Sequence, residues 1–198
     1  FTFNLFFFGA VAFAPPFLVL YYQAAGFSGA QIGVLTGIAP LVTLFGAPLW
    51  TSLADRTRRH RLIMSLALLI AAATVLAFPF LNAFAPILVL AVLFNAFFAP
   101  VASLADSATL FMLADKKEMY GRIRLGGTID FGLAAPLAGA LVQNYGLKLA
   151  FWGCAGLLLL AFSISQKFVY SPLQADDSSR GGVRSLLMDR RWRLFLIL

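Results

Sequence analysis

The stretch LIMSLALLIAAATVLAFPFLNAFAPILVLAVLFNAFFAPVASLA, residues 62–105, contains no Asp, Glu, Lys or Arg. It has room for two helices of ~20 residues, the length that crosses a bilayer, and Pro79 and Pro86 mark the division between them. Charged residues are also absent from 1–54 and from 149–166. Because such sequence is stable in hydrocarbon only with its backbone hydrogen-bonded, the pattern predicts an all-α membrane protein.

The composition excludes several other classes of protein. The 198 residues are 61% hydrophobic and 12% charged, which is too apolar for one water-soluble domain of this length. The single cysteine, Cys154, provides neither a disulfide framework nor a cysteine metal site. The net charge of +7 lies in short connections and not on a folded soluble face, so we expect the lipid bilayer as a partner and no nucleic acid.

Six spans and a connector are expected. The spans are predicted at 3–22, 31–53, 62–81, 86–113, 122–142 and 149–170, with a basic loop at 54–61. The pair Pro15 and Pro16 should kink the first span. We expect a six-helix bundle over 1–170, a polar cytoplasmic connector over 171–193 and the start of a seventh span at 194–198, in a chain cut inside its first and seventh spans.

The basic residues predict an orientation. If the spans alternate, every Lys and Arg except Lys148 falls on the side of the loops after the second, fourth and sixth spans. The positive-inside rule places that side, and the N-terminus, in the cytoplasm. We therefore expect a multi-pass protein of the cell membrane.

Asp106 and Arg124 are the first candidates for a functional site. Asp106 lies about two turns inside the fourth span and Arg124 in the first turn of the fifth, so antiparallel neighbours would place both at similar depth. They form either a structural ion pair or a site in which Arg124 donates to a substrate and Asp106 holds the guanidinium.

Asp130 lies deeper in the fifth span, about 240° around the helix from Arg124. A charged carboxylate is costly at this depth, so Asp130 is a candidate for reversible protonation. The alternative is a pairing with a polar group on another helix.

The loop at Asp55 carries a dense charge pattern, LADRTRRHR over residues 53–61. Asp55, Arg56 and Arg59 are either an orientation signal at a helix end or a charge cluster that stabilises one transport conformation. His60 is expected to be solvated in this loop.

Two segments carry a resemblance to a known family. One segment resembles the lactose permease branch of the major facilitator superfamily, and also the related nucleoside symporters. It follows an acid in the preceding span and reads Tyr120-Gly121-Arg122-Ile123-Arg124-Leu125-Gly126-Gly127. The loop matches the family pattern Gly-x-Leu-Ala-Asp-Arg-x-Gly-Arg-Arg at residues 53–56 and at Arg59, and departs from it at Thr51, Arg58 and His60.

This resemblance implies the N-terminal six-helix half of a major facilitator fold, built from two inverted three-helix repeats and completed by a C-terminal half. It implies proton symport of a small polar solute, sugar-like or nucleoside-like, by alternating access. Asp106 and Arg124 would bind substrate, and Phe131 falls where the family places a tryptophan against the sugar ring. We expect no metal, no cofactor and no enzymatic activity.

Other functions remain as alternatives. Gly132, Pro136 and Gly139 loosely resemble the pattern of drug efflux antiporters of the same fold, although helix packing also explains them. An intramembrane enzyme would need a nucleophile with a base, or metal ligands, inside the spans. A structural or receptor-like membrane protein is the remaining alternative.

Overall fold

The computed structural model describes residues 1–114, 116 and 118–170. All regular secondary structure in this part of the chain is helical, in the order α1 (Thr2–Phe13), η1 (Pro15–Phe17), α2 (Leu18–Ala24), α3 (Gly29–Thr57), α4 (His60–Ala77), η2 (Phe78–Phe80), α5 (Phe84–Leu113), α6 (Met119–Tyr145) and α7 (Lys148–Ser165). With α1–α2 and α4–η2 each taken as one span, these residues form six helical segments long and apolar enough to cross a membrane. The predicted all-α class is confirmed.

The first span is broken where the two prolines predict it. A short 3-10 segment at Pro15–Phe17 separates α1 from α2, because a proline cannot donate a hydrogen bond to the preceding turn. Beyond the break, the Tyr21 hydroxyl approaches the carbonyl oxygens of Phe78 (2.6 Å) and Leu81 (2.5 Å). This contact ties the end of the first span to the end of the third.

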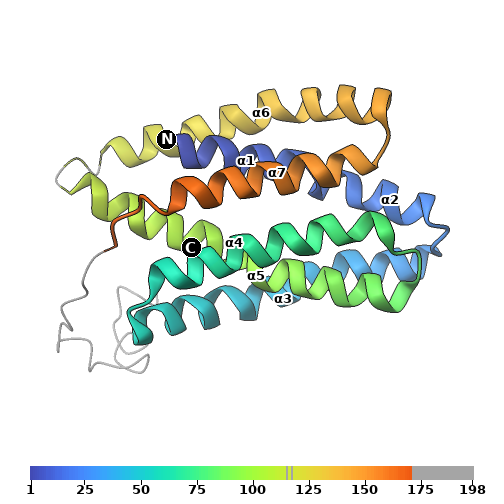
Figure 1. The fold of residues 1–198 in the computed structure, drawn as a ribbon, viewed down its shortest axis with the longest axis horizontal. Coiled ribbons are helices and arrows are strands. Elements are labelled where there is room, and N and C mark those ends of the chain that lie inside the picture. The colour runs from blue at the N-terminus through green and yellow to red at the C-terminus, as the bar shows by residue number, and fades with distance from the viewer. Residues whose placement is uncertain (115, 117, 171–198) are drawn as a thin grey trace, which may run out of the picture.

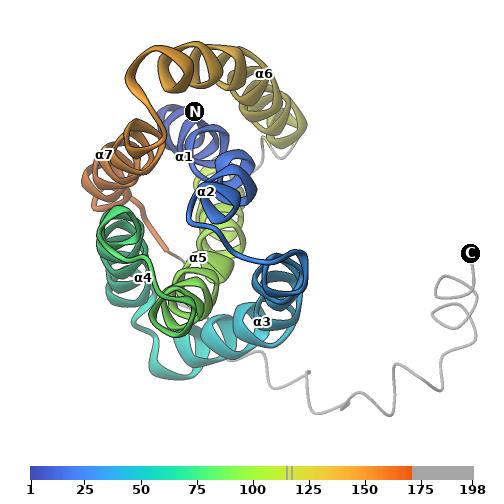
Figure 2. The same ribbon diagram turned by 90° about the vertical axis from the view of Figure 1, so that its right-hand side faces the viewer.

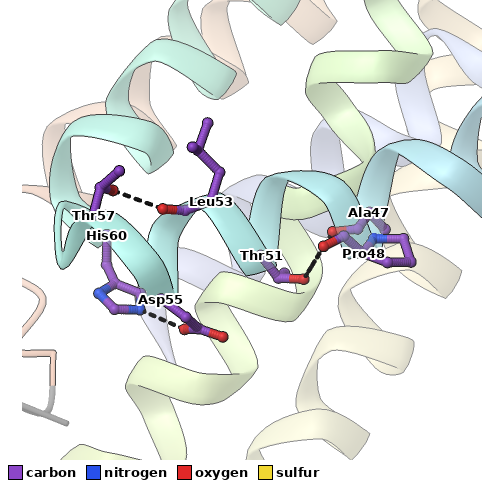
Figure 3. Close-up of polar contacts among 7 residues, drawn as sticks. All are labelled: Ala47, Pro48, Thr51, Leu53, Asp55, Thr57 and His60. Atoms are coloured by element: carbon purple, nitrogen blue, oxygen red, sulfur yellow. Dashed lines mark hydrogen bonds and ion pairs between the residues drawn. The ribbon is translucent and has the colours of Figure 1, made fainter. Parts of the chain in front are cut away.

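The prediction of a basic loop over residues 54–61 is wrong. Helix α3 continues to Thr57, α4 begins at His60, and only Arg58 and Arg59 lie between them. Arg58 takes the left-handed conformation (φ 54°) that reverses the chain, where the family pattern has glycine. The Thr57 hydroxyl donates to the Leu53 carbonyl oxygen, one turn earlier in α3, at 2.7 Å (Figure 3).

Other helix ends also differ from prediction. Helix α6 runs from Met119 to Tyr145, longer than the predicted 122–142, and Gly146 turns the chain with φ 89°. Helix α7 ends at Ser165, five residues before the predicted end. The connector at 171–193 and the start of a seventh span at 194–198 lie outside the described residues.

The helices lie side by side along the long axis of the molecule (Figure 1). The α3–α4 turn, the end of α5, the start of α6 and the end of α7 gather at one end, here called the basic end. The α2–α3, α4–α5 and α6–α7 turns gather at the other, here called the Lys148 end. The spans therefore alternate, as the distribution of basic residues predicts.

The packing has internal symmetry. Helix α3 packs on α5 as α6 packs on α1, α4 packs on α5 as α7 packs on α1, and α4 and α7 pack on each other (Figure 2). Such a pattern follows when residues of the first three spans and of the last three form inverted repeats. The structure therefore has the repeat arrangement that the resemblance implies.

The core lies among α1, α4, α5 and α7. Buried aromatic and aliphatic side chains from these helices, such as Phe7, Leu68 and Phe151, form one cluster. Helix α6 approaches α1 closely at Gly127, which has no side chain. A Cβ added there would lie 2.5 Å from the Phe8 ring. Helices α3 and α6 bury few residues and expose long apolar faces, as expected of helices that contact lipid or further protein.

Candidate functional site

Asp106 of α5 and Arg124 of α6 form an ion pair. The Arg124 Nη1 group donates to Asp106 Oδ2 at 2.8 Å, and the side chains are 59% and 35% exposed for Arg124 and Asp106, respectively. Antiparallel helices that meet at the basic end bring these two residues to the same depth. The pair expected from the sequence is therefore present in the structure.

A bilayer centred on α5 would place the pair inside its hydrocarbon core. Helix α5 has 30 residues, ~45 Å at ~1.5 Å per residue, and Asp106 lies ~11 Å from its centre. The half-thickness of the hydrocarbon core is ~15 Å. Charged groups at this depth are costly unless they are paired or face a water-filled cavity, and Asp106 and Arg124 are both paired and half-exposed.

Tyr120 is a third member of this site that the sequence reading missed. Arg124 Nη1 also donates to the Tyr120 hydroxyl at 2.7 Å, from one turn earlier in α6. The i, i+4 spacing places Tyr120 and Arg124 on one face of the helix and could have identified the contact. Within the described residues, Nη1 is held by two acceptors, while Nη2 and Nε make no hydrogen bond.

Helix α1 closes one side of the pair. Asn4, Phe7 and Phe8 line a small cavity of about 30 Å³ together with Asp106 and Arg124. A space of this size accommodates little more than a water molecule. The α1 side of the site is therefore filled, and the exposed edge of the Arg124 guanidinium offers the remaining donors.

Phe131 and Asp130 lie further along α6 and do not line this small cavity. Phe131 is half-buried, and its i+7 spacing places it on the face of Arg124, ~10 Å along the helix. Asp130 lies off that face, and its Oδ2 atom is buried with no hydrogen-bond partner among the described residues. No contact with another described residue assigns either side chain a role, so both roles stay predictions.

At the basic end, Asp55 pairs with His60. The His60 Nε2 and Asp55 Oδ1 atoms are 2.9 Å apart (Figure 3), and His60 is only 8% exposed. The expectation of a solvated His60 is therefore wrong. Arg56 and Arg59 are exposed, and the described structure shows no ion pair between them and Asp55.

His60 is buried because segments distant in sequence converge on it. The Tyr170 ring stacks on the imidazole with centroids 5.5 Å apart, and burial raises the pKa of the Tyr170 hydroxyl to about 12. Arg61 donates to the Gln166 carbonyl oxygen, and Gln166 Nε2 donates to Ser65 Oγ at 2.8 Å. These contacts tie α3, α4 and the end of α7 together at the basic end.

The six-helix fold matches the N-terminal half of a major facilitator fold. The structure is similar to the crystal structure of nucleoside transporter NupG, with a TM-score of 0.76 and 18% identity, over 98% of this chain and 51% of that one. The family model described as MFS_1 like family matches residues 2–193. The chain belongs to this family.

Related sequences agree with that assignment. Maltose permease of Geobacillus stearothermophilus is 32% identical over 98% of this chain and 49% of its own length. Uncharacterized transporter YwbF of Bacillus subtilis (strain 168) is 29% identical over 99% of this chain and 50% of its own. Multidrug resistance protein MdtG of Serratia proteamaculans (strain 568) is 30% identical over 85% of this chain and 43% of its own length.

The chain spans about half the length of these relatives. The family and its named relatives are transporters and not enzymes. The chain is therefore a multi-pass membrane protein of a transporter family.

Proposed function

We propose that the whole transporter imports a small polar solute, sugar-like or nucleoside-like, by proton symport with alternating access. The observation that carries the proposal is the Arg124 guanidinium, which is fixed by Asp106 and Tyr120, while its Nη2 and Nε groups donate to none of the described residues. Hydroxyl and carboxylate oxygens of a polar solute are the acceptors that such donors recognise.

Asp106 would have two tasks in this site. Its Oδ2 atom accepts from Arg124, and a carboxylate has further lone pairs that can accept from a substrate hydroxyl. Phe131, two helical turns away on the same face, would offer a flat apolar surface to a sugar or base ring. Maltose permease, whose name states a sugar, supports a solute of this class.

Asp130 is the proposed proton site. Its buried Oδ2 atom has no hydrogen-bond partner in the described part of the chain. A carboxylate in such surroundings is stabilised when it gains a proton or a partner. A proton taken up with substrate and released on the other side would couple the two fluxes.

We further propose a cell-membrane location with the basic end in the cytoplasm, because positive residues favour that side. The exposed apolar faces of α3 and α6 would then contact a C-terminal six-helix half. Asp55, Arg56 and Arg59, at the basic end, would form a charge cluster that stabilises one transport conformation. Arg56 and Arg59 are exposed there and are free to reach that second half.

The alternative function is proton-coupled efflux of drugs or metabolites. Multidrug resistance protein MdtG is 30% identical over 85% of this chain, compared with 32% over 98% for maltose permease. Gly132, Pro136 and Gly139 of α6 are compatible with either function.

A flux experiment separates the two. The whole transporter is reconstituted in proteoliposomes, and uptake of labelled maltose and uridine is measured with an imposed pH gradient of either sign. Symport predicts solute accumulation on the side toward which protons flow, whereas antiport predicts accumulation on the side from which protons leave.

The Arg124→Lys variant should lose the flux, and Arg122→Gln, an exposed neighbour on the same helix, should retain it. If both variants keep the flux, the proposed role of Arg124 is refuted.

A further inference from the structure

A large groove lies at the Lys148 end, far from the Asp106–Arg124 pair. Its volume is about 1120 Å³, and its walls come from α1, α2, the residues after α4, the end of α6 and the start of α7. Figures 1 and 2 show the α6–α7 turn and the end of α2 at this end of the bundle. Nothing in the transport mechanism proposed above uses this groove.

The wall of the groove is largely apolar and aromatic. Phe13 and Tyr21 line it from the first span, and Phe151 and Trp152 line it from α7. Such a surface accommodates a hydrocarbon chain, because removal of apolar area from water and close packing both favour it. A sugar-like solute would find few hydrogen-bond partners on it.

The rim of the groove carries the aromatic residues that are typical of the lipid headgroup region. Tyr145 at the end of α6 is 74% exposed, and Trp152, in the second turn of α7, is 49% exposed. Tyrosine and tryptophan concentrate at the membrane–water interface, where the ring is apolar and one edge is wet. A ligand in this groove would therefore have its polar part among the headgroups and its apolar part in the membrane.

Lys148 gives the rim an uncompensated positive charge. It lines the groove, is exposed, and is the only Lys or Arg in the described part of the Lys148 end. The nearest carboxylate on the preceding helix is Asp130, which lies ~22 Å before the end of α6. No ion pair occupies Lys148 among the described residues.

We propose that this groove binds an anionic phospholipid from the leaflet at the Lys148 end. The ammonium group of Lys148 contacts the phosphate, and an acyl chain lies along the aromatic wall between Phe13 and Trp152. Charge complementarity selects an anionic headgroup, because Lys148 lines the groove and no Asp or Glu among the described residues lines it. The inference rests on membrane insertion alone and does not depend on the proposed transport function.

Native mass spectrometry tests this site. The purified whole transporter is released from nanodiscs of phosphatidylglycerol and phosphatidylcholine, and the bound lipid is titrated. We expect Lys148→Gln to weaken phosphatidylglycerol binding about fivefold, the effect of one basic residue near an anionic lipid. Lys148→Arg should restore binding. Ala24→Trp, which fills the groove from α2 and keeps the charge, should also lose it.

Lys167→Gln is the matched control. Lys167 is exposed just beyond the opposite end of α7, so its loss changes the net charge equally and leaves the groove intact. Unchanged phosphatidylglycerol binding in both Lys148→Gln and Ala24→Trp would overturn the proposal. An equal loss in Lys167→Gln would overturn it as well, because the attraction would then belong to the surface as a whole. Either result leaves the transport proposal unaffected.

Discussion

Removal of the Tyr120 hydroxyl should weaken substrate binding without removing any group proposed to contact the substrate. In the structure, Arg124 Nη1 is held by Asp106 at 2.8 Å and by Tyr120 at 2.7 Å. Tyr120→Phe keeps the ring and deletes one of these two acceptors. The guanidinium then keeps its charge and its ion pair but gains rotational freedom.

The size of the effect follows from the exposure of the bond. Hydrogen bonds to charged groups contribute about 1.5–3 kcal/mol when well buried. Arg124 is 59% exposed, and water partly replaces a lost partner there, so we expect a value below this range, about 1 kcal/mol. Because about 1.4 kcal/mol corresponds to a tenfold change, the Kd for substrate should rise about fivefold.

Equilibrium binding of maltose and uridine to the purified whole transporter measures this change. Tyr145→Phe is the matched control, since it removes a hydroxyl from the same helix at the opposite end. An unchanged Kd in Tyr120→Phe, together with loss of substrate binding in Arg124→Lys, would refute the positioning role of Tyr120. Thermal unfolding of both tyrosine variants should remain close to wild type, which separates positioning from stability.

Three further predictions concern other parts of the molecule. Gly127→Val should destabilise the α1–α6 contact by about 1–3 kcal/mol, because the new Cβ would meet the Phe8 ring at 2.5 Å; a thermal midpoint equal to wild type would contradict this. His60→Leu should lower the thermal midpoint, because it removes the hydrogen bond to Asp55 at the point where α3, α4 and the end of α7 meet; Lys167→Gln is the control and should leave the midpoint unchanged. Asp130→Asn should leave substrate binding intact and abolish proton-driven accumulation, as measured by coupled flux; full accumulation in this variant would remove Asp130 from the coupling step.

Sequence alone predicts the spans of this protein well. Long hydrophobic stretches with few or no charges mark the spans because a bilayer disfavours unpaired charge, and the positive-inside rule groups the basic residues at one end. The break at Pro15 and Pro16 is also predictable, since it follows from the covalent structure of proline. The Asp106–Arg124 pair could be anticipated because two antiparallel neighbours fix the relative depth of their residues.

The remainder depends on contacts between distant segments. The short turn at Arg58 is not predicted from the sequence because its conformation is left-handed in a residue that rarely adopts it. The charged neighbours of His60 predict contact with water, whereas Tyr170, more than 100 residues later, covers it. The groove at Lys148 is likewise formed by four spans, and no local pattern reports such a convergence.

The central claim is that Arg124 of α6, fixed by Asp106, binds the transported solute. Equilibrium binding of labelled substrate to the whole transporter carrying Arg124→Ala, compared with Arg122→Ala on the same helix, measures this directly. We predict that binding is lost in Arg124→Ala and retained in Arg122→Ala, with both proteins inserted and folded. Wild-type affinity in a folded Arg124→Ala transporter would contradict the claim.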